Sequence, residues 1–155
     1  GHVTGVQTCA LPIFPPGTGD VQLSLVQTTP INGAVIVTTP SEVAMEDARK
    51  AVRMFEQVRT PILGLVENMS YLQLPDGQRM DVFGQGGGQR MAAAMNIPFL
   101  TELPLNPQVR IGGDSGRPAA LDPTGNGAPF HALAEKVAAA LAGNTKAAPK
   151  ITLED

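Results

Sequence analysis

With 155 residues, 43% of them hydrophobic and 16% charged, the chain has the composition of one globular domain with a modest core rather than of a disordered segment. The formal net charge of −3 gives no support for nucleic-acid binding, and no apolar run approaches membrane-spanning length. The single cysteine excludes an internal disulfide and fits a reducing compartment. We therefore expect a cytoplasmic protein that binds neither nucleic acid nor membrane.

The first thirteen residues, GHVTGVQTCALPI, differ from the rest of the chain because they show no helical periodicity and only a weak strand signal. They resemble translated sequencing-adapter read-through, so we interpret residues 1–13 as a non-native leader. Cys9 lies within this leader and is assigned no redox or metal role. The remaining chain is interpreted as one domain over residues 14–143, followed by a small, polar and loose tail over residues 144–155.

A stiff turn at residues 15–20, with the sequence PPGTGD, leads into the first predicted helix. The two prolines disfavour helix, while Gly17 and Gly19 permit a close approach of the backbone or a positive φ. Thr18 offers a hydroxyl group, and Asp20 is expected to cap the helix that follows. Backbone N–H groups at such a corner suit an oxyanion or a metal-bound phosphate, and a plain turn with an Asp cap is the alternative.

Helix and strand signals then alternate along the chain. We expect helices over residues 20–28 and from 42 to about 57, the second capped by Ser41. Short apolar runs at residues 34–39 and 62–67 are typical of strands buried on both faces. This strand–helix–strand spacing predicts a βαβ unit of a parallel sheet, in which ligands bind beyond the carboxyl ends of the strands.

Asn68 directly follows the second of these strands and is well placed for a ligand. Its amide offers a donor and an acceptor, which matches the edge of a purine base, although a turn Asn is the alternative interpretation. Downstream, Pro75-Asp76-Gly77 predicts a hairpin within residues 71–82. Further elements are expected as a strand at residues 99–103, a short helical stretch from Val109 and a helix over residues 128–142.

A glycine-rich run, Gly84-Gln85-Gly86-Gly87-Gly88, precedes a predicted helix over residues 89–95. A glycine-rich entry to a helix can cradle a phosphate, but this one lacks the Lys-Ser/Thr ending of a P-loop. We interpret it as a flexible loop or a dimer-facing turn.

Four motifs in this order resemble the Mrp/ApbC family of P-loop ATPases, which are MinD-like proteins that carry iron–sulfur clusters. They are PPGTGD with the helix after it, Val66-Glu67-Asn68-Met69-Ser70-Tyr71, Phe83 to Gly88, and Pro104 to Arg110 with Gly113 to Pro118. The resemblance covers roughly Phe14 to Gly143. It implies an α/β, three-layer P-loop NTPase fold with a mostly parallel sheet, of which the chain holds the C-terminal portion without the N-terminal P-loop half.

The resemblance also assigns site residues and cofactors. It implies ATP and Mg²⁺, with a switch-like turn formed by Gly17, Thr18, Gly19 and Asp20. It implies that Asn68 contacts the adenine and that Pro104 and Asn106 lie in the loop beside it. No metal ligand is assigned.

Many family members carry Cys-x-x-Cys shortly after Asn-Met-Ser-Tyr, where the thiolates hold a 4Fe-4S cluster shared across a homodimer. Residues 72–81 contain no cysteine, so cluster binding through that motif is not available to this chain. Ile13 also stands where the family places an Asp before the turn, and a Gly-Lys-rich P-loop is absent from these 155 residues. We therefore expect the chain by itself to hydrolyse ATP weakly or not at all.

The family implies an ATP-dependent iron–sulfur carrier or assembly factor that acts as a homodimer on client apoproteins. The missing cysteine pair keeps open a MinD/ParA-like regulator that switches partner binding by nucleotide-dependent dimerisation. A third hypothesis is a non-catalytic scaffold that docks partners through residues 84–88 and the hairpin.

Overall fold

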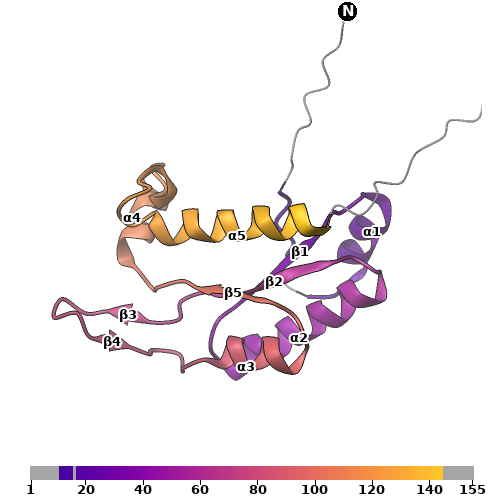
Figure 1. Cartoon of the computed structure of the whole chain (residues 1–155), viewed down its shortest axis with the longest axis horizontal. Coiled ribbons are helices and arrows are strands. Elements are labelled where there is room, and N and C mark those ends of the chain that lie inside the picture. Colours follow the sequence, from indigo (N-terminus) through magenta and orange to yellow (C-terminus); the bar gives the residue numbers. More distant parts are fainter. Residues whose placement is uncertain (1–10, 16, 145–155) are drawn as a thin grey trace, which may run out of the picture.

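A three-stranded parallel sheet lies at the centre of the computed structural model, which describes residues 11–15 and 17–144 (Figure 1). The strands lie in the order β1 (Ala34–Thr38), β2 (Ile62–Glu67) and β5 (Phe99–Glu102). Since β2 pairs in parallel with both neighbours, the carboxyl ends of all three strands meet at one edge of the sheet. The predicted parallel α/β fold is confirmed.

Parts of the predicted domain boundaries lie outside the described residues. These parts are residues 1–10 of the interpreted leader, with Cys9, and residues 145–155 of the interpreted tail. Pro16 of the PPGTGD turn also lies outside them.

Helices cover both faces of the sheet and give the three layers visible in Figure 1. The helices on one face are α1 (Asp20–Thr28), α2 (Glu42–Gln57) and α3 (Gly87–Ala94). The opposite face is crossed by α5 (Ala128–Asn144). No helix within residues 11–15 and 17–144 is both long and apolar enough to cross a bilayer.

The connections between strands carry the remaining elements. An antiparallel hairpin of β3 (Leu72–Gln73) and β4 (Arg79–Met80) projects from the body of the molecule between β2 and α3 (Figure 1). It confirms the hairpin predicted from Pro75-Asp76-Gly77. Between β5 and α5 lie α4 (Pro107–Asp114) and a 3₁₀ turn at Ala119–Leu121.

The two faces of the sheet are buried to different depths. Under α2 and α3 the core is deep, and Val52 and Leu65 have no exposed surface. Under α5 the buried residues are Val66, Leu100 and Leu103, against which half-buried side chains of α5 pack. Because α5 lies over β2 and β5 rather than β1, Val37 remains 61% exposed. The expectation that the first strand is buried on both faces is therefore wrong at Val37.

The caps predicted for two helices differ in outcome. The Ser41 hydroxyl accepts a hydrogen bond from the Ala44 N–H at 3.4 Å, which confirms the predicted cap of α2. The expected cap by Asp20 is wrong, because Gly19 occupies the N-cap of α1 and Asp20 is the first helical residue. In this first turn, the Asp20 carboxyl group interacts favourably with the positive end of the helix dipole rather than serving as the N-cap.

Candidate functional site

Three chain segments at the carboxyl edge of the sheet are held together by backbone hydrogen bonds. The Asn68 N–H donates to the Thr38 carbonyl at 2.7 Å, which ties the loop after β2 to the end of β1. On its other side, the Ser70 N–H donates to the Leu103 carbonyl at 2.9 Å and the Leu105 N–H donates to the Tyr71 carbonyl at 2.7 Å. The loops after β2 and β5 therefore lie side by side, which is the place where parallel α/β sheets bind ligands.

Asn68 has the conformation of a turn residue. Its side-chain oxygen accepts a hydrogen bond from the Met69 N–H at 2.9 Å, and Met69 has a left-handed φ of 55°. Among the described residues, the Asn68 side-chain N–H₂ group has no hydrogen-bond partner. The turn role and a ligand role are thus compatible, because the turn occupies one lone pair of the oxygen and leaves the donors.

Pro104 and Asn106 follow β5 on the adjacent loop. The Asn106 oxygen accepts a hydrogen bond from the Gln108 N–H at 2.9 Å and thereby caps α4. Its amide N–H₂ donates to the Asn126 side-chain oxygen at 2.8 Å. The structure therefore brings Asn68 and Pro104 into neighbouring loops, whereas Asn106 already has a structural use for both of its polar atoms.

A buried carboxyl group lies directly beneath these loops. Glu67, the last residue of β2, is 1% exposed. The Ser70 hydroxyl donates a hydrogen bond to one of its oxygens, and the Gly88 N–H at the start of α3 donates to the other at 2.5 Å. Sequence reasoning quoted Glu67 within a motif but gave it no role. A charged residue that ends an otherwise apolar strand was the signal that could have singled it out.

The glycine-rich run lets α3 approach the ends of the strands. A Cβ atom on Gly87 would lie 2.9 Å from the Pro40 carbonyl oxygen and 2.7 Å from the Met45 sulfur, and one on Gly88 would lie 2.8 Å from the Glu67 carboxyl oxygen. Both glycines are buried, and α3 begins at Gly87, two residues earlier than predicted. Close packing, rather than flexibility, explains why these two residues are glycines. The Gly88 N–H already donates to the internal Glu67 carboxyl group, so it is not left for a phosphate.

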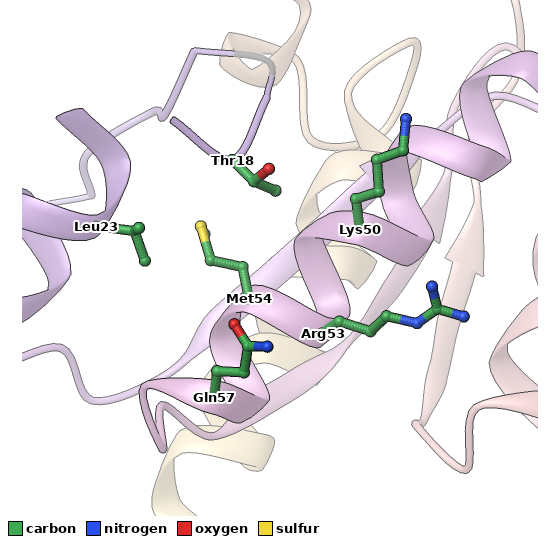
Figure 2. A pocket seen from close by; sticks show the side chains of 6 residues that line it. All are labelled: Thr18, Leu23, Lys50, Arg53, Met54 and Gln57. Atoms are coloured by element: carbon green, nitrogen blue, oxygen red, sulfur yellow. The ribbon is translucent and has the colours of Figure 1, made fainter. Parts of the chain in front are cut away.

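The switch-like turn lies elsewhere. Thr18 lines a shallow hollow of about 230 Å³ with Leu23 of α1 and residues of the second half of α2, which are Lys50, Arg53, Met54 and Gln57 (Figure 2). Because α2 runs from the carboxyl edge of β1 back to the start of β2, this hollow lies toward the amino edge of the sheet. The structure therefore does not bring Gly17, Thr18, Gly19 and Asp20 together with Asn68 and Pro104.

The charged groups around this hollow do not converge. Figure 2 shows Lys50 and Arg53 extending away from the Leu23 and Met54 side chains. The Lys50 ammonium group lies 3.3 Å from the Asp47 carboxyl group. The hollow thus has no concentrated positive charge for a phosphate.

The hairpin is fastened to the sheet through Arg79. Its guanidinium group donates to both Glu102 carboxyl oxygens at 2.5 and 3.0 Å and to Asp81 at 2.8 Å, and it lies 4.1 Å from the centre of the Tyr71 ring. The hydrogen bonds to Glu102, and then to Asp81, raise the pKa of Arg79 above its usual value. An ion-pair network therefore occupies the hairpin in which many resembling proteins carry two cysteines.

The part of the chain that the structure describes contains no group of three or more His, Cys, Asp or Glu side chains arranged to hold a metal ion. Asp81, directly after β4, and Glu102 of β5 are paired with Arg79 instead.

Solved structures that share this fold define the class of protein. A nucleotide-binding protein from Archaeoglobus fulgidus, solved in complex with ADP, is 43% identical with a TM-score of 0.60, over 66% of this chain and 43% of that one. The cell-division ATPase MinD from Pyrococcus furiosus shares the fold at 22% identity with a TM-score of 0.52, over 70% of this chain and 43% of that one. The chain has part of a MinD-like P-loop NTPase fold.

Sequence comparison then gives the family. The family model described as ParA, NUBPL iron-transfer P-loop NTPase, matches residues 13–141, and the chain belongs to this family. The Mrp/ApbC resemblance is thereby confirmed.

Curated relatives carry names that agree with this family. An iron–sulfur cluster carrier protein from Deinococcus radiodurans is 53% identical over 109 residues, which are 70% of this chain and 31% of the relative. The mouse iron–sulfur cluster transfer protein NUBPL is 43% identical over 114 residues, which are 73% of this chain and 36% of the relative. The chain thus spans about a third of the length of these curated relatives.

Proposed function

We propose that the complete gene product is a nucleotide-dependent carrier or assembly factor for iron–sulfur clusters, and that this chain supplies the base side of its nucleotide site. The observation that carries the proposal is the joined pair of loops at the carboxyl edge, which places Asn68 beside the Pro104 loop. The same fold occurs in a 43% identical protein that binds ADP. The names of the curated relatives support the iron–sulfur role.

The side chains at this edge suit an adenine base. The free N–H₂ group of Asn68 can donate to a ring nitrogen, and its oxygen keeps a second lone pair for the exocyclic amine. The half-buried Pro104 ring offers an apolar surface against which the flat base can rest. Asn106 contributes by fixing the loop that carries Pro104, since its side chain joins α4 to Asn126.

The phosphates and Mg²⁺ do not fit the residues that are present. These 155 residues include no Gly-Lys-rich P-loop, and no acidic cluster for Mg²⁺ exists within the described segments. We derive no hydrolytic step from this chain and expect it alone to turn over ATP weakly or not at all. A switch-like role of Gly17 to Asp20 belongs to the same proposal for the complete gene product.

The iron–sulfur cluster is cargo in this proposal. Residues 14–155 contain no cysteine, so this chain supplies no thiolate from its hairpin or its sheet. A homodimer, client apoproteins and a cytoplasmic location are implied by the family resemblance and are part of the proposal.

The hairpin favours a second candidate function. In residues 71–82 a network around Arg79 takes the place of a cysteine pair, which suits a nucleotide-switched regulator without a cluster. Such a regulator would use the same base-binding edge but exchange partners instead of clusters.

Iron and sulfide reconstitution of the complete gene product separates these functions. A stable cluster that passes to an apoprotein in an ATP-dependent manner supports the carrier. Absence of a cluster together with nucleotide-dependent dimerisation favours the regulator. If the complete gene product binds neither a cluster nor a nucleotide, the result favours the scaffold hypothesis.

A further inference from the structure

We propose that Glu67 is a positioning residue that couples the start of α3 to the base-binding loop, and so holds Asn68 in its binding conformation. The proposal rests on the nucleotide site proposed above and deepens it. It assigns to a buried acidic side chain the task of joining the glycine-rich run at residues 84–88 to residues 68–70.

The geometry gives Glu67 two separate attachments. One carboxyl oxygen accepts from the Ser70 hydroxyl, three residues further along the same loop, and the other accepts from the Gly88 N–H, 21 residues away. Glu67 is 1% exposed and Ser70 has no exposed surface, so water cannot replace either hydrogen bond. A single side chain thus fastens two segments that no strand pairing connects.

Asn68 and Met69 lie between the two residues of this clamp. Glu67 and Ser70 hold the loop from below, and Met69 between them has a left-handed φ of 55°. Backbone bonds from Asn68 to Thr38 and from Ser70 to Leu103 hold the loop from the sides. Removal of the Glu67 carboxyl group therefore leaves the segment that carries the Asn68 amide held by these backbone bonds alone.

The start of α3 suits a hydrogen-bond acceptor such as the Glu67 carboxyl group. Gly88 lies in the first turn of α3, where the helix dipole is positive and an acidic group is stabilised. The close approach also requires glycine, since a Cβ on Gly88 would lie 2.8 Å from the Glu67 carboxyl oxygen. The Glu67 carboxyl group, the Ser70 hydroxyl and the Gly88 N–H thus form one hydrogen-bonded unit.

The test uses three variants of the complete gene product. Glu67→Ala removes both attachments. Glu67→Gln keeps an oxygen for the Gly88 N–H and offers an amide N–H to the Ser70 oxygen, so it serves as the conservative rescue. Leu133→Ala destabilises the α5 face, where Leu133 packs against Val66, Leu100 and Leu103, without touching the clamp.

Hydrogen exchange without nucleotide measures the coupling itself. We expect amides of residues 68–71 and 86–90 to exchange about tenfold faster in Glu67→Ala than in Leu133→Ala, because the lost hydrogen bonds are local. Glu67→Gln should stay close to the wild type. Faster exchange in only one of the two segments, or the same exchange in both alanine variants, would overturn the coupling.

Affinity for ADP measures the positioning. Glu67→Ala should bind ADP about tenfold more weakly, while Glu67→Gln and Leu133→Ala should stay within about threefold of the wild type. Equal ADP affinity in Glu67→Ala and wild type would refute the positioning role. A wild-type protein that binds no ADP would instead refute the proposed nucleotide site, and the exchange result alone would then decide the coupling.

Discussion

The carboxyl-edge loops and the PPGTGD turn share the same family resemblance but are built in opposite ways. The loops are tied to one another by backbone bonds and by Glu67, which is 1% exposed. The turn exposes Gly17, Thr18, Gly19 and Asp20, and Val21 at the start of α1 is 72% exposed. Contacts among the described residues thus hold the first region from several sides, whereas the second is largely exposed, with its Pro15 carbonyl accepting a hydrogen bond from the Gln22 side chain at 3.3 Å. We expect substitutions at the carboxyl edge to lower the free energy of unfolding more than substitutions in the turn region.

The largest effect is expected for Glu67→Ala. It leaves the buried Ser70 hydroxyl and Gly88 N–H without their acceptor, and should lower the free energy of unfolding by about 3 kcal/mol. Urea unfolding of the complete gene product measures this difference, with Glu56→Gln on the exposed surface of α2 as the control. A loss no larger than that of the control would mean that the clamp contributes nothing to stability.

A smaller effect is expected at the glycine-rich run. Gly87→Ala places a methyl group 2.9 Å from the Pro40 carbonyl oxygen and 2.7 Å from the Met45 sulfur, and should cost about 2 kcal/mol. The matched control is Gly113→Ala in α4, where a Cβ meets no atom within 4 Å, and where we expect a change within about 0.5 kcal/mol or a gain in stability. Equal thermal unfolding of the two variants would contradict close packing at Gly87.

Asn106→Ala should cost about 1 kcal/mol, because it removes the cap of α4 and the hydrogen bond to Asn126. Replacement of Asn106 by Asp keeps the capping oxygen and should recover most of this loss. Thermal unfolding of both variants checks the prediction, and a fully stable alanine variant would show that Asn106 has no structural role.

The smallest effect is expected in the turn region. Val21→Ser changes an exposed side chain of α1 and should alter the free energy of unfolding by less than about 0.5 kcal/mol. The same substitution at Val52, which has no exposed surface, is the contrasting variant and should cost several times more. A large loss at Val21 in urea unfolding would show that the turn region is held as firmly as the carboxyl edge.

Local sequence signals were sufficient for most of the fold. The apolar run of β2 and the Ser41 cap of α2 depend on neighbouring residues, and both occur as predicted. The exposure of Val37 was not predictable in the same way, because it depends on which strands α5 covers.

The site was predictable only where a motif is continuous in the sequence. Asn68 follows a strand, and its place at the carboxyl edge of the sheet was predictable from that position. The hydrogen bond between Glu67 and Gly88 spans 21 residues, and nothing in local periodicity connects them. Asp20 shows that a local signal can also mislead. Asp is a common capping residue, but Asp20 lies one position inside the helix and Gly19 occupies the N-cap.

The most direct test of the nucleotide site is the ADP affinity of Asn68→Ala in the complete gene product, measured by calorimetry beside Glu56→Gln. Loss of the amide should weaken ADP binding about tenfold, whereas Glu56→Gln should stay within about threefold because Glu56 lies on the exposed surface of α2, outside the proposed site. Unchanged ADP affinity in Asn68→Ala, with the wild type binding ADP, would contradict a base-binding role for the carboxyl edge of this sheet.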